Sequence, residues 1–193
     1  MNADQLFTMF ERARELSGHH DYVVIGSLSV LGVDRPVPGE MSMSIDIDCY
    51  TQADPPRIFD LKAALGEDSD FHVANGYYLD PVSPGLPSLP QGWEARMNLL
   101  ERNGLRLWFL SPDDAAISKL ARSEPRDLKW VRAGILSGLI SLPNLSSRLW
   151  HTNFLDADEE QRVRKQVAAD SAWFETIRKR STKRAKHGAK TSQ

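Results

Sequence analysis

The chain has 193 residues, of which 41% are hydrophobic and 26% are charged, and this composition is ordinary for a globular domain and excludes wholesale disorder. No stretch approaches the roughly 18 to 20 consecutive apolar residues that a membrane-spanning helix needs, and the sequence begins without a basic leader followed by an apolar segment. We therefore expect a cytoplasmic protein with no membrane partner, and the single Cys49 agrees with a reducing compartment.

The net charge is −2, but the charge is unevenly distributed between an acidic body and a basic end. Seven lysines and arginines and no acid follow Glu175, which leaves 17 of the 24 basic residues against 26 acidic ones, so residues 1–177 carry −9. Residues 181–193 have no large apolar side chain, and we expect them to form a mobile basic tail. Such a tail either follows a nucleic-acid backbone or is a solvated end that assists solubility.

The first half of the chain predicts alternating helices and strands. A helix capped by Asp4 should carry apolar residues at helical spacing and stop at Gly18. A proline-rich loop at residues 36–39 should separate the first two strands. The patterns predict strands at Tyr22–Ile25, Ser44–Cys49 and Phe71–Leu79, with a further helix from Pro55 to about Gly66.

The second half predicts a hairpin followed by helices. Paired strands at Trp93–Leu99 and Leu105–Leu110 should turn at Asn103-Gly104, and Ser111 should cap a helix whose first turn contains Pro112. Two or three helices should follow to about residue 150, and a charged helix should cover residues 157–180. The expected organisation is an α/β core at residues 1–110, with a mixed sheet flanked by helices, a helical C-terminal portion at 111–180, and the tail.

Two aspartates in the second predicted strand indicate a metal site. Because a strand alternates its faces, Asp46 and Asp48 should point the same way as Ser44, roughly 6 to 7 Å apart at a rise of about 3.3 Å per residue. Like charges at that separation repel unless water screens them or a cation bridges them. Oxygen ligands of this kind suit Mg²⁺, which is commonly shared between one or two carboxylates and nucleotide phosphates.

Gly26 and Ser27 follow the first predicted strand and offer backbone N–H groups and a hydroxyl to a phosphate, with no Cβ at Gly26 to block the approach. Together with Asp46 and Asp48, they indicate a site for a metal-bound nucleoside triphosphate. Asp80, at the end of the third predicted strand, is a candidate third carboxylate that acts as general base or completes a two-metal site.

The order Gly-Ser, a loop, then Asp-x-Asp resembles the signature of the nucleotidyltransferase superfamily. More narrowly, the chain resembles minimal nucleotidyltransferases related to AbiEii-type toxins, which carry a lysine in a K-L-A helix and an aspartate in a following R-D-L or K-D-L segment. Here these fall on Lys119 and Asp127, and the resemblance covers about residues 20–140. It implies that Lys119 binds triphosphate oxygens, that Arg126 contacts phosphate and that Asp127 is a catalytic or positioning carboxylate.

Each candidate also has an ordinary structural interpretation. Asp46 and Asp48 can face solvent on a half-exposed strand, and Asp80 can be a turn residue before proline. Lys119 can extend its charge to water from an apolar helix, and Asp127 can be an acid that favours the first turn of a helix.

The resemblance implies an enzyme that transfers a nucleotide from a nucleoside triphosphate to RNA, particularly tRNA, or to a protein side chain, within a toxin-antitoxin system that supplies an antitoxin partner. Relatives often place a basic residue four positions before the first metal aspartate, where this chain has Ser42. That difference supports an alternative, a degenerate fold that binds a partner protein or nucleic acid without catalysis. A third possibility is an antitoxin-like or regulatory component.

Overall fold

The computed structural model describes residues 1–85 and 87–188, with side chains described through residue 180. Its core is a five-stranded mixed sheet in the order β3-β2-β1-β5-β4. The strands are β1 (Asp21–Val24), β2 (Asp46–Thr51), β3 (Tyr78–Pro81), β4 (Asn98–Arg102) and β5 (Leu105–Phe109). β1 pairs antiparallel with β2 and parallel with β5, while β2 pairs parallel with β3 and β4 pairs antiparallel with β5. The predicted α/β class is confirmed.

The sheet is anchored on its central strand, where Tyr22, Val23 and Val24 are all buried. Helix α1 (Ala3–Ser17) packs its apolar side into the same core and ends at Gly18 in the left-handed conformation, as predicted. Its N-cap is Asn2 instead of the predicted Asp4. The Asn2 side chain accepts from the Gln5 N–H while the Gln5 side chain accepts from the Asn2 N–H, so a capping box begins this helix two residues earlier than predicted.

Two predicted strands are wrong in whole or in part. Residues 71–75 lie in helix α3 (Asp70–Asn75), because Ser69 caps it and Gly76 ends it in the left-handed conformation, and only the end of the predicted strand enters β3. Trp93–Arg96 is a 3₁₀ turn, η4, so β4 begins at Asn98. The predicted Pro55–Gly66 helix is divided into the 3₁₀ helix η3 (Pro55–Leu61) and helix α2 (Lys62–Leu65).

The turn of the hairpin and the helices after it follow the prediction. Asn103 and Gly104 both have positive φ, at 51° and 73°, as a tight hairpin turn requires. The Ser111 hydroxyl accepts from the Asp114 N–H at the start of α4 (Pro112–Arg122). The remaining helices are α5 (Pro125–Ser137), α6 (Leu142–Arg148), the 3₁₀ helix η5 (Leu149–His151) and α7 (Ala157–Gly188).

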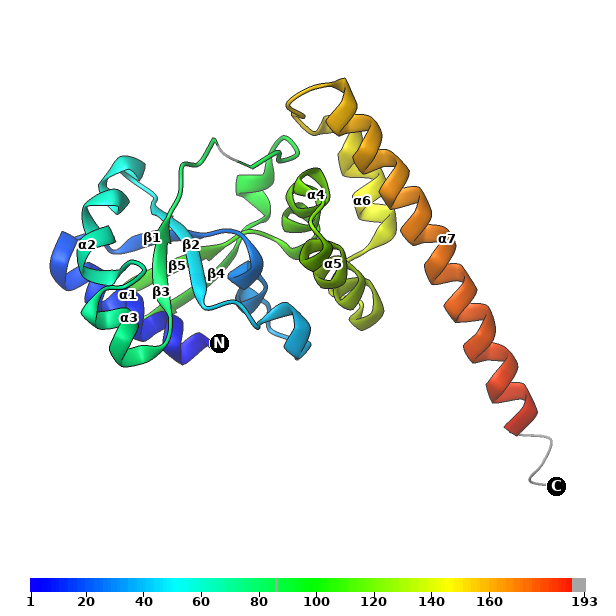
Figure 1. The fold of residues 1–193 in the computed structure, drawn as a ribbon, viewed down its shortest axis with the longest axis horizontal. Coiled ribbons are helices and arrows are strands. Elements are labelled where there is room, and N and C mark those ends of the chain that lie inside the picture. The colour runs from blue at the N-terminus through cyan, green and yellow to red at the C-terminus, as the bar shows by residue number, and fades with distance from the viewer. Residues whose placement is uncertain (86, 189–193) are drawn as a thin grey trace.

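Figure 1 shows the sheet and helices α1, α2 and α3 on one side, and α4, α5, α6 and α7 on the other. Helix α7 crosses the outer face of the helical portion, where Val163 and Val167 are buried, and its C-terminal part extends beyond the body. It continues to Gly188, past the predicted end at Arg180. Residues 189–193 of the predicted tail lie outside the described residues, and its mobility stays a prediction. In the described part of the chain, no helix is both long enough and apolar enough to cross a membrane.

Candidate active site

Three carboxylates converge at one edge of the sheet. Asp48 in β2 and Asp80 in β3 are paired residues of neighbouring parallel strands, and Asp46 lies two residues before Asp48 on the same face. One oxygen from each of the three carboxylates lies within 4.8 Å of the others, and all three residues are partly exposed. The structure therefore brings Asp46, Asp48 and Asp80 together, and the neighbours Ile47 and Cys49 point into the core.

The three carboxylates of this cluster repel one another. Burial, with added repulsion from Asp46 and Asp80, raises the pKa of Asp48 to about 7, and burial and repulsion from Asp46 also raise the pKa of Asp80. Asp46 accepts a short hydrogen bond from the Ser44 hydroxyl. Three oxygen-only donors that repel one another are the ligand type that fits a hard divalent cation such as Mg²⁺ or Mn²⁺. The donor set thus fits the predicted magnesium.

Gly26, which follows β1 and precedes the 3₁₀ helix η1 (Ser27–Gly32), lies against the carboxylates. The Ile25 N–H donates to the Asp48 carbonyl at 2.9 Å, which holds Gly26 directly against the Asp48 side chain. Gly26 has φ 66° and ψ −151°, a region open essentially to glycine alone. A Cβ atom built at this position would lie 1.9 Å from Asp48 Oδ2. Gly26 is therefore required both by its backbone conformation and by the carboxylate beside it.

Lys119 does not extend to water, since its side chain is only 5% exposed. Its ammonium donates to the Ser27 hydroxyl at 2.8 Å and to Asp127 Oδ1 at 3.1 Å, and it lies 5.0 Å from the centre of the Trp130 ring. The Trp130 indole N–H donates to the backbone carbonyls of Ser27 and Met41. The buried Lys119 of α4 therefore connects Ser27, just after β1, with Asp127 in α5.

Asp127 lies in the first turn of α5 and is fully buried. Burial by itself would raise its pKa, but hydrogen bonds from Arg122 and the charge of Lys119 hold the pKa below its usual range. Burial outweighs the attraction of Asp127 at Lys119 and lowers the pKa of that ammonium. Asp127 is therefore the shared anion of two cations, and it is a positioning group in this arrangement.

Arg122 is a site residue that sequence reasoning missed. Its Nε and Nη2 donate to the two oxygens of Asp127 at 2.8 and 2.7 Å, and its side chain is 49% exposed. A signal was present in the sequence, because Arg122 follows Lys119 by three residues and residues three apart share one side of a helix.

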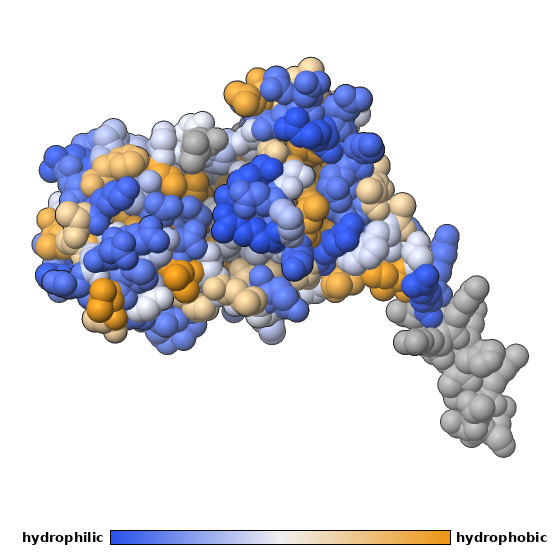
Figure 2. Space-filling model, in the orientation of Figure 1, coloured by the Kyte–Doolittle hydropathy of each residue, from blue (hydrophilic) through white to orange (hydrophobic). Residues whose placement is uncertain are grey.

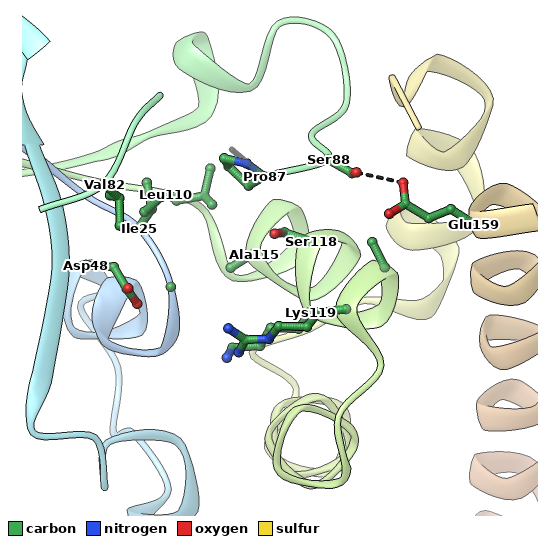
Figure 3. Close-up of a pocket in the computed structure, with 13 residues that line it drawn as sticks. Ile25, Asp48, Val82, Pro87, Ser88, Leu110, Ala115, Ser118, Lys119 and Glu159 are labelled. Carbon is green, nitrogen blue, oxygen red and sulfur yellow. Dashed lines mark hydrogen bonds between the residues drawn. The ribbon is translucent and has the colours of Figure 1, made fainter. Parts of the chain in front are cut away.

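Asp48 from the carboxylate cluster and Lys119 and Arg122 from α4 line one cleft of about 320 Å³, at the lower end of the size range of small-molecule sites. In Figure 3, Asp48 projects from the sheet side and Lys119 from the α4 side. Apolar side chains line the cleft between them, and Ser88 and Glu159 join by a hydrogen bond of 2.7 Å at its far end. The cleft thus lies between strand β2, which carries Asp48, and helix α4, which carries Lys119.

Arg126 is placed differently from the other candidates. Its side chain is 70% exposed and pairs with Glu124 at 2.8 Å. It lines a second, smaller pocket with Ser27 and Trp130 and is absent from the lining of the cleft that contains Asp48. In the space-filling view of Figure 2, strongly hydrophilic surface lies over the middle of the molecule, between the sheet portion and helix α7 of Figure 1.

Comparison with known protein families finds a match over most of the chain. A family model described as "Nucleotidyltransferase of unknown function (DUF6036)" matches residues 4–181. No curated protein and no solved structure matches the chain. The match covers the sheet, the cleft and most of the helical portion.

Proposed function

Because this chain belongs to the family of nucleotidyltransferases of unknown function whose model spans residues 4–181, we propose that it transfers a nucleotide from a magnesium-bound nucleoside triphosphate to an acceptor hydroxyl. The hydroxyl oxygen bonds to the α-phosphorus, the bond from that phosphorus to the bridging oxygen of the β-phosphate breaks, and pyrophosphate leaves. The observation that carries the proposal is the cleft lined by Gly26, by the buried Lys119 and by Asp48, which belongs to a cluster of three carboxylates. Anionic phosphates with a bound cation match both sides of such a cleft.

The residues at and beside the cleft have different proposed roles, which follow from their charge. Asp46 and Asp48 would hold Mg²⁺, which when bound would neutralise phosphate charge and polarise the α-phosphorus. Gly26 lets a phosphate approach the backbone, and the Ser27 hydroxyl, which accepts from Lys119, keeps its own proton to donate. Asp80 is partly exposed and has a raised pKa, so its carboxylate is suited to accept the proton of the acceptor hydroxyl.

For the acceptor we propose RNA, tRNA in particular. The support is the cluster of seven basic residues after residue 177, which contrasts with a body of charge −9. An acidic body repels a polyanion, so RNA binding would depend on that basic segment. A protein side chain is the competing acceptor, and the assay below separates the two.

The test incubates the purified protein with each labelled nucleoside triphosphate, Mg²⁺ and either total RNA or protein extract. Transfer of label to RNA is expected, and the Asp46→Asn/Asp48→Asn variant should show none. Asp60→Asn is the matched control, because Asp60 is an exposed aspartate paired with Arg57 outside the cleft and its variant should transfer normally. Equal signals from the parent and the double variant would refute the proposal, and label on protein alone would change the acceptor.

The resemblance to AbiEii-type toxins leads to a related proposal, that the transfer inhibits growth and is countered by an antitoxin partner. Expression of the parent should then slow growth of the host cell, and expression of the Asp46→Asn/Asp48→Asn variant should not. The non-catalytic alternative, which Ser42 suggests, predicts nucleotide affinity that is absent or independent of Mg²⁺.

A further inference from the structure

We infer that Arg122, and not Lys119 alone, supplies the main cationic contact to the polyphosphate of the bound nucleotide. The inference rests on the proposed function and assigns the phosphate end of the cleft to a residue outside the Gly-Ser, Asp-x-Asp and K-L-A motifs. The inference follows from the number of N–H groups on Lys119 and on Arg122 that remain available to a phosphate.

Lys119 has few N–H groups available for a phosphate. An ammonium carries three N–H groups, and two of them are used on the Ser27 hydroxyl and on Asp127 Oδ1. The side chain is 5% exposed, and Trp130 lies against its ammonium. Lys119 can therefore make at most one contact with a phosphate unless it abandons Ser27 or Asp127, and leaving a buried carboxylate with fewer partners is costly.

Arg122 has more donors and better access. A guanidinium carries five N–H groups in a fixed fork, and within the described residues only Nε and Nη2 donate, both to Asp127. Nη1 has no hydrogen-bond partner there. The side chain is 49% exposed and lines the same cleft as Gly26 and Asp48. Arg122 thus presents a second edge to the cleft while Asp127 holds the first, and guanidinium groups bind phosphate in a bidentate manner.

The net charge of the residues around Asp127 also supports a ligand-binding role for Arg122. Asp127 already has Lys119 as a buried partner, and Glu124 lies 4.0 Å from Arg122 Nε but also pairs with Arg126. The three cations Lys119, Arg122 and Arg126 against these two carboxylates leave the cluster with a net charge of +1. That excess charge acts on the sheet side as well, since Lys119 and Arg122 both lower the pKa of Asp48 against the effect of burial. A half-exposed arginine that lines the cleft in a cluster of net positive charge is suited to an anionic ligand as well as to stability.

The experiment measures binding of inorganic triphosphate and of nucleoside triphosphates, with Mg²⁺, by isothermal titration calorimetry. Arg122→Gln should weaken binding about tenfold to a hundredfold, the range expected for a lost charge-assisted contact. Arg122→Lys keeps the charge but loses the fork, so it should weaken binding by a smaller factor. Arg12→Gln is the control, because Arg12 is an exposed arginine paired with Glu15 on α1 and should bind as the parent does.

Two results would overturn the inference, and they differ in their cause. If the parent binds triphosphate and folded Arg122→Gln binds within about twofold of it, a margin well below the loss of one contact, only the role of Arg122 fails. If the parent itself shows no Mg²⁺-dependent binding, the proposed function fails with it. Circular dichroism checks the fold of each variant, and if Arg122→Gln does not fold, Arg122→Lys decides: unchanged affinity refutes the inference and weaker affinity supports it.

Discussion

The raised pKa of Asp48 predicts an unusual response of stability to pH. Burial, followed by repulsion from Asp46 and Asp80, raises this pKa from 3.8 to about 7 in the folded protein. Between these two values the folded state binds more protons than the unfolded state, so the free energy of unfolding should fall as the pH rises through this range. Most soluble proteins gain stability from their carboxylates as the pH rises, and this site should act in the opposite direction.

The size of the effect follows from the shift. A difference of about three pH units corresponds to roughly 4 kcal/mol, at 1.36 kcal/mol per unit, and this is an upper bound because Asp48 retains some contact with water. A change of 1 kcal/mol moves the melting temperature of a chain of this length by about 2 to 4 °C. We therefore expect the metal-free protein to melt several degrees lower at about pH 8 than at about pH 5.

Added Mg²⁺ should reverse this loss, because the cation binds the ionised carboxylates and competes with protons. A ligand that binds the folded state alone stabilises it by about 1.4 kcal/mol for each tenfold excess over its dissociation constant. The stabilisation by Mg²⁺ should be large at about pH 8 and nearly absent at about pH 5, below the folded pKa of Asp48.

The assay is thermal unfolding followed by circular dichroism, at several pH values, with and without saturating Mg²⁺. Asp48→Asn removes the titrating group with little change in shape, so its stability should vary less with pH and respond weakly to Mg²⁺. Asp60→Asn, an exposed aspartate outside the cluster, should behave as the parent does. A parent whose stability stays level or rises between about pH 5 and 8, or an Asp48→Asn variant with the same slope as the parent, would refute the reasoning.

Three further predictions concern the parts that surround the carboxylates. Gly26→Ala should lose at least about 1 to 3 kcal/mol of stability, because of backbone strain and the clash with Asp48, and should bind Mg²⁺ more weakly in a titration. Asp127→Asn leaves Lys119 without its buried anion, so urea unfolding should show a loss of about 3 kcal/mol; an unchanged midpoint would contradict this. Deleting residues 181–193 should reduce RNA retention at low salt and leave triphosphate binding unchanged, whereas unchanged retention would remove the role given to the basic segment.

The local features of the fold were predictable because short-range rules decide them. The alternation of Asp46 and Asp48 with Ile47 and Cys49, the Asn103-Gly104 turn and the Ser111 cap each depend on a few neighbouring residues. Residues 71–75 were predicted as a strand because they include apolar side chains, yet α3 buries none of its residues. There the cap at Ser69 and the stop at Gly76 decide the structure and outweigh the apolar pattern.

The assembly of the site depended on pairing over long distances in the chain. Asp80 reaches Asp48 only because β3 pairs with β2 in parallel and in this register, and no local pattern specifies that register. The contact of Lys119 with Ser27 joins residues 92 positions apart. The resemblance to a family placed Lys119 and Asp127 in the site, but it did not indicate that both are buried or that Arg122 shares Asp127 with Lys119.

The arrangement of charges at the cleft supports the proposed ligand-binding role of these residues. Within the described residues, Asp48 and Asp80 make no ion pair, although Lys119 and Arg122 line the same cleft as Asp48 and both bind Asp127. Opposite charges this close would gain from pairing with each other if stability were the only requirement. The fold keeps them apart by fixing Asp127 in α5 and Gly26 beside Asp48. A ligand that carries a cation at one end and phosphates at the other would satisfy both groups at once, which neither group can do for the other.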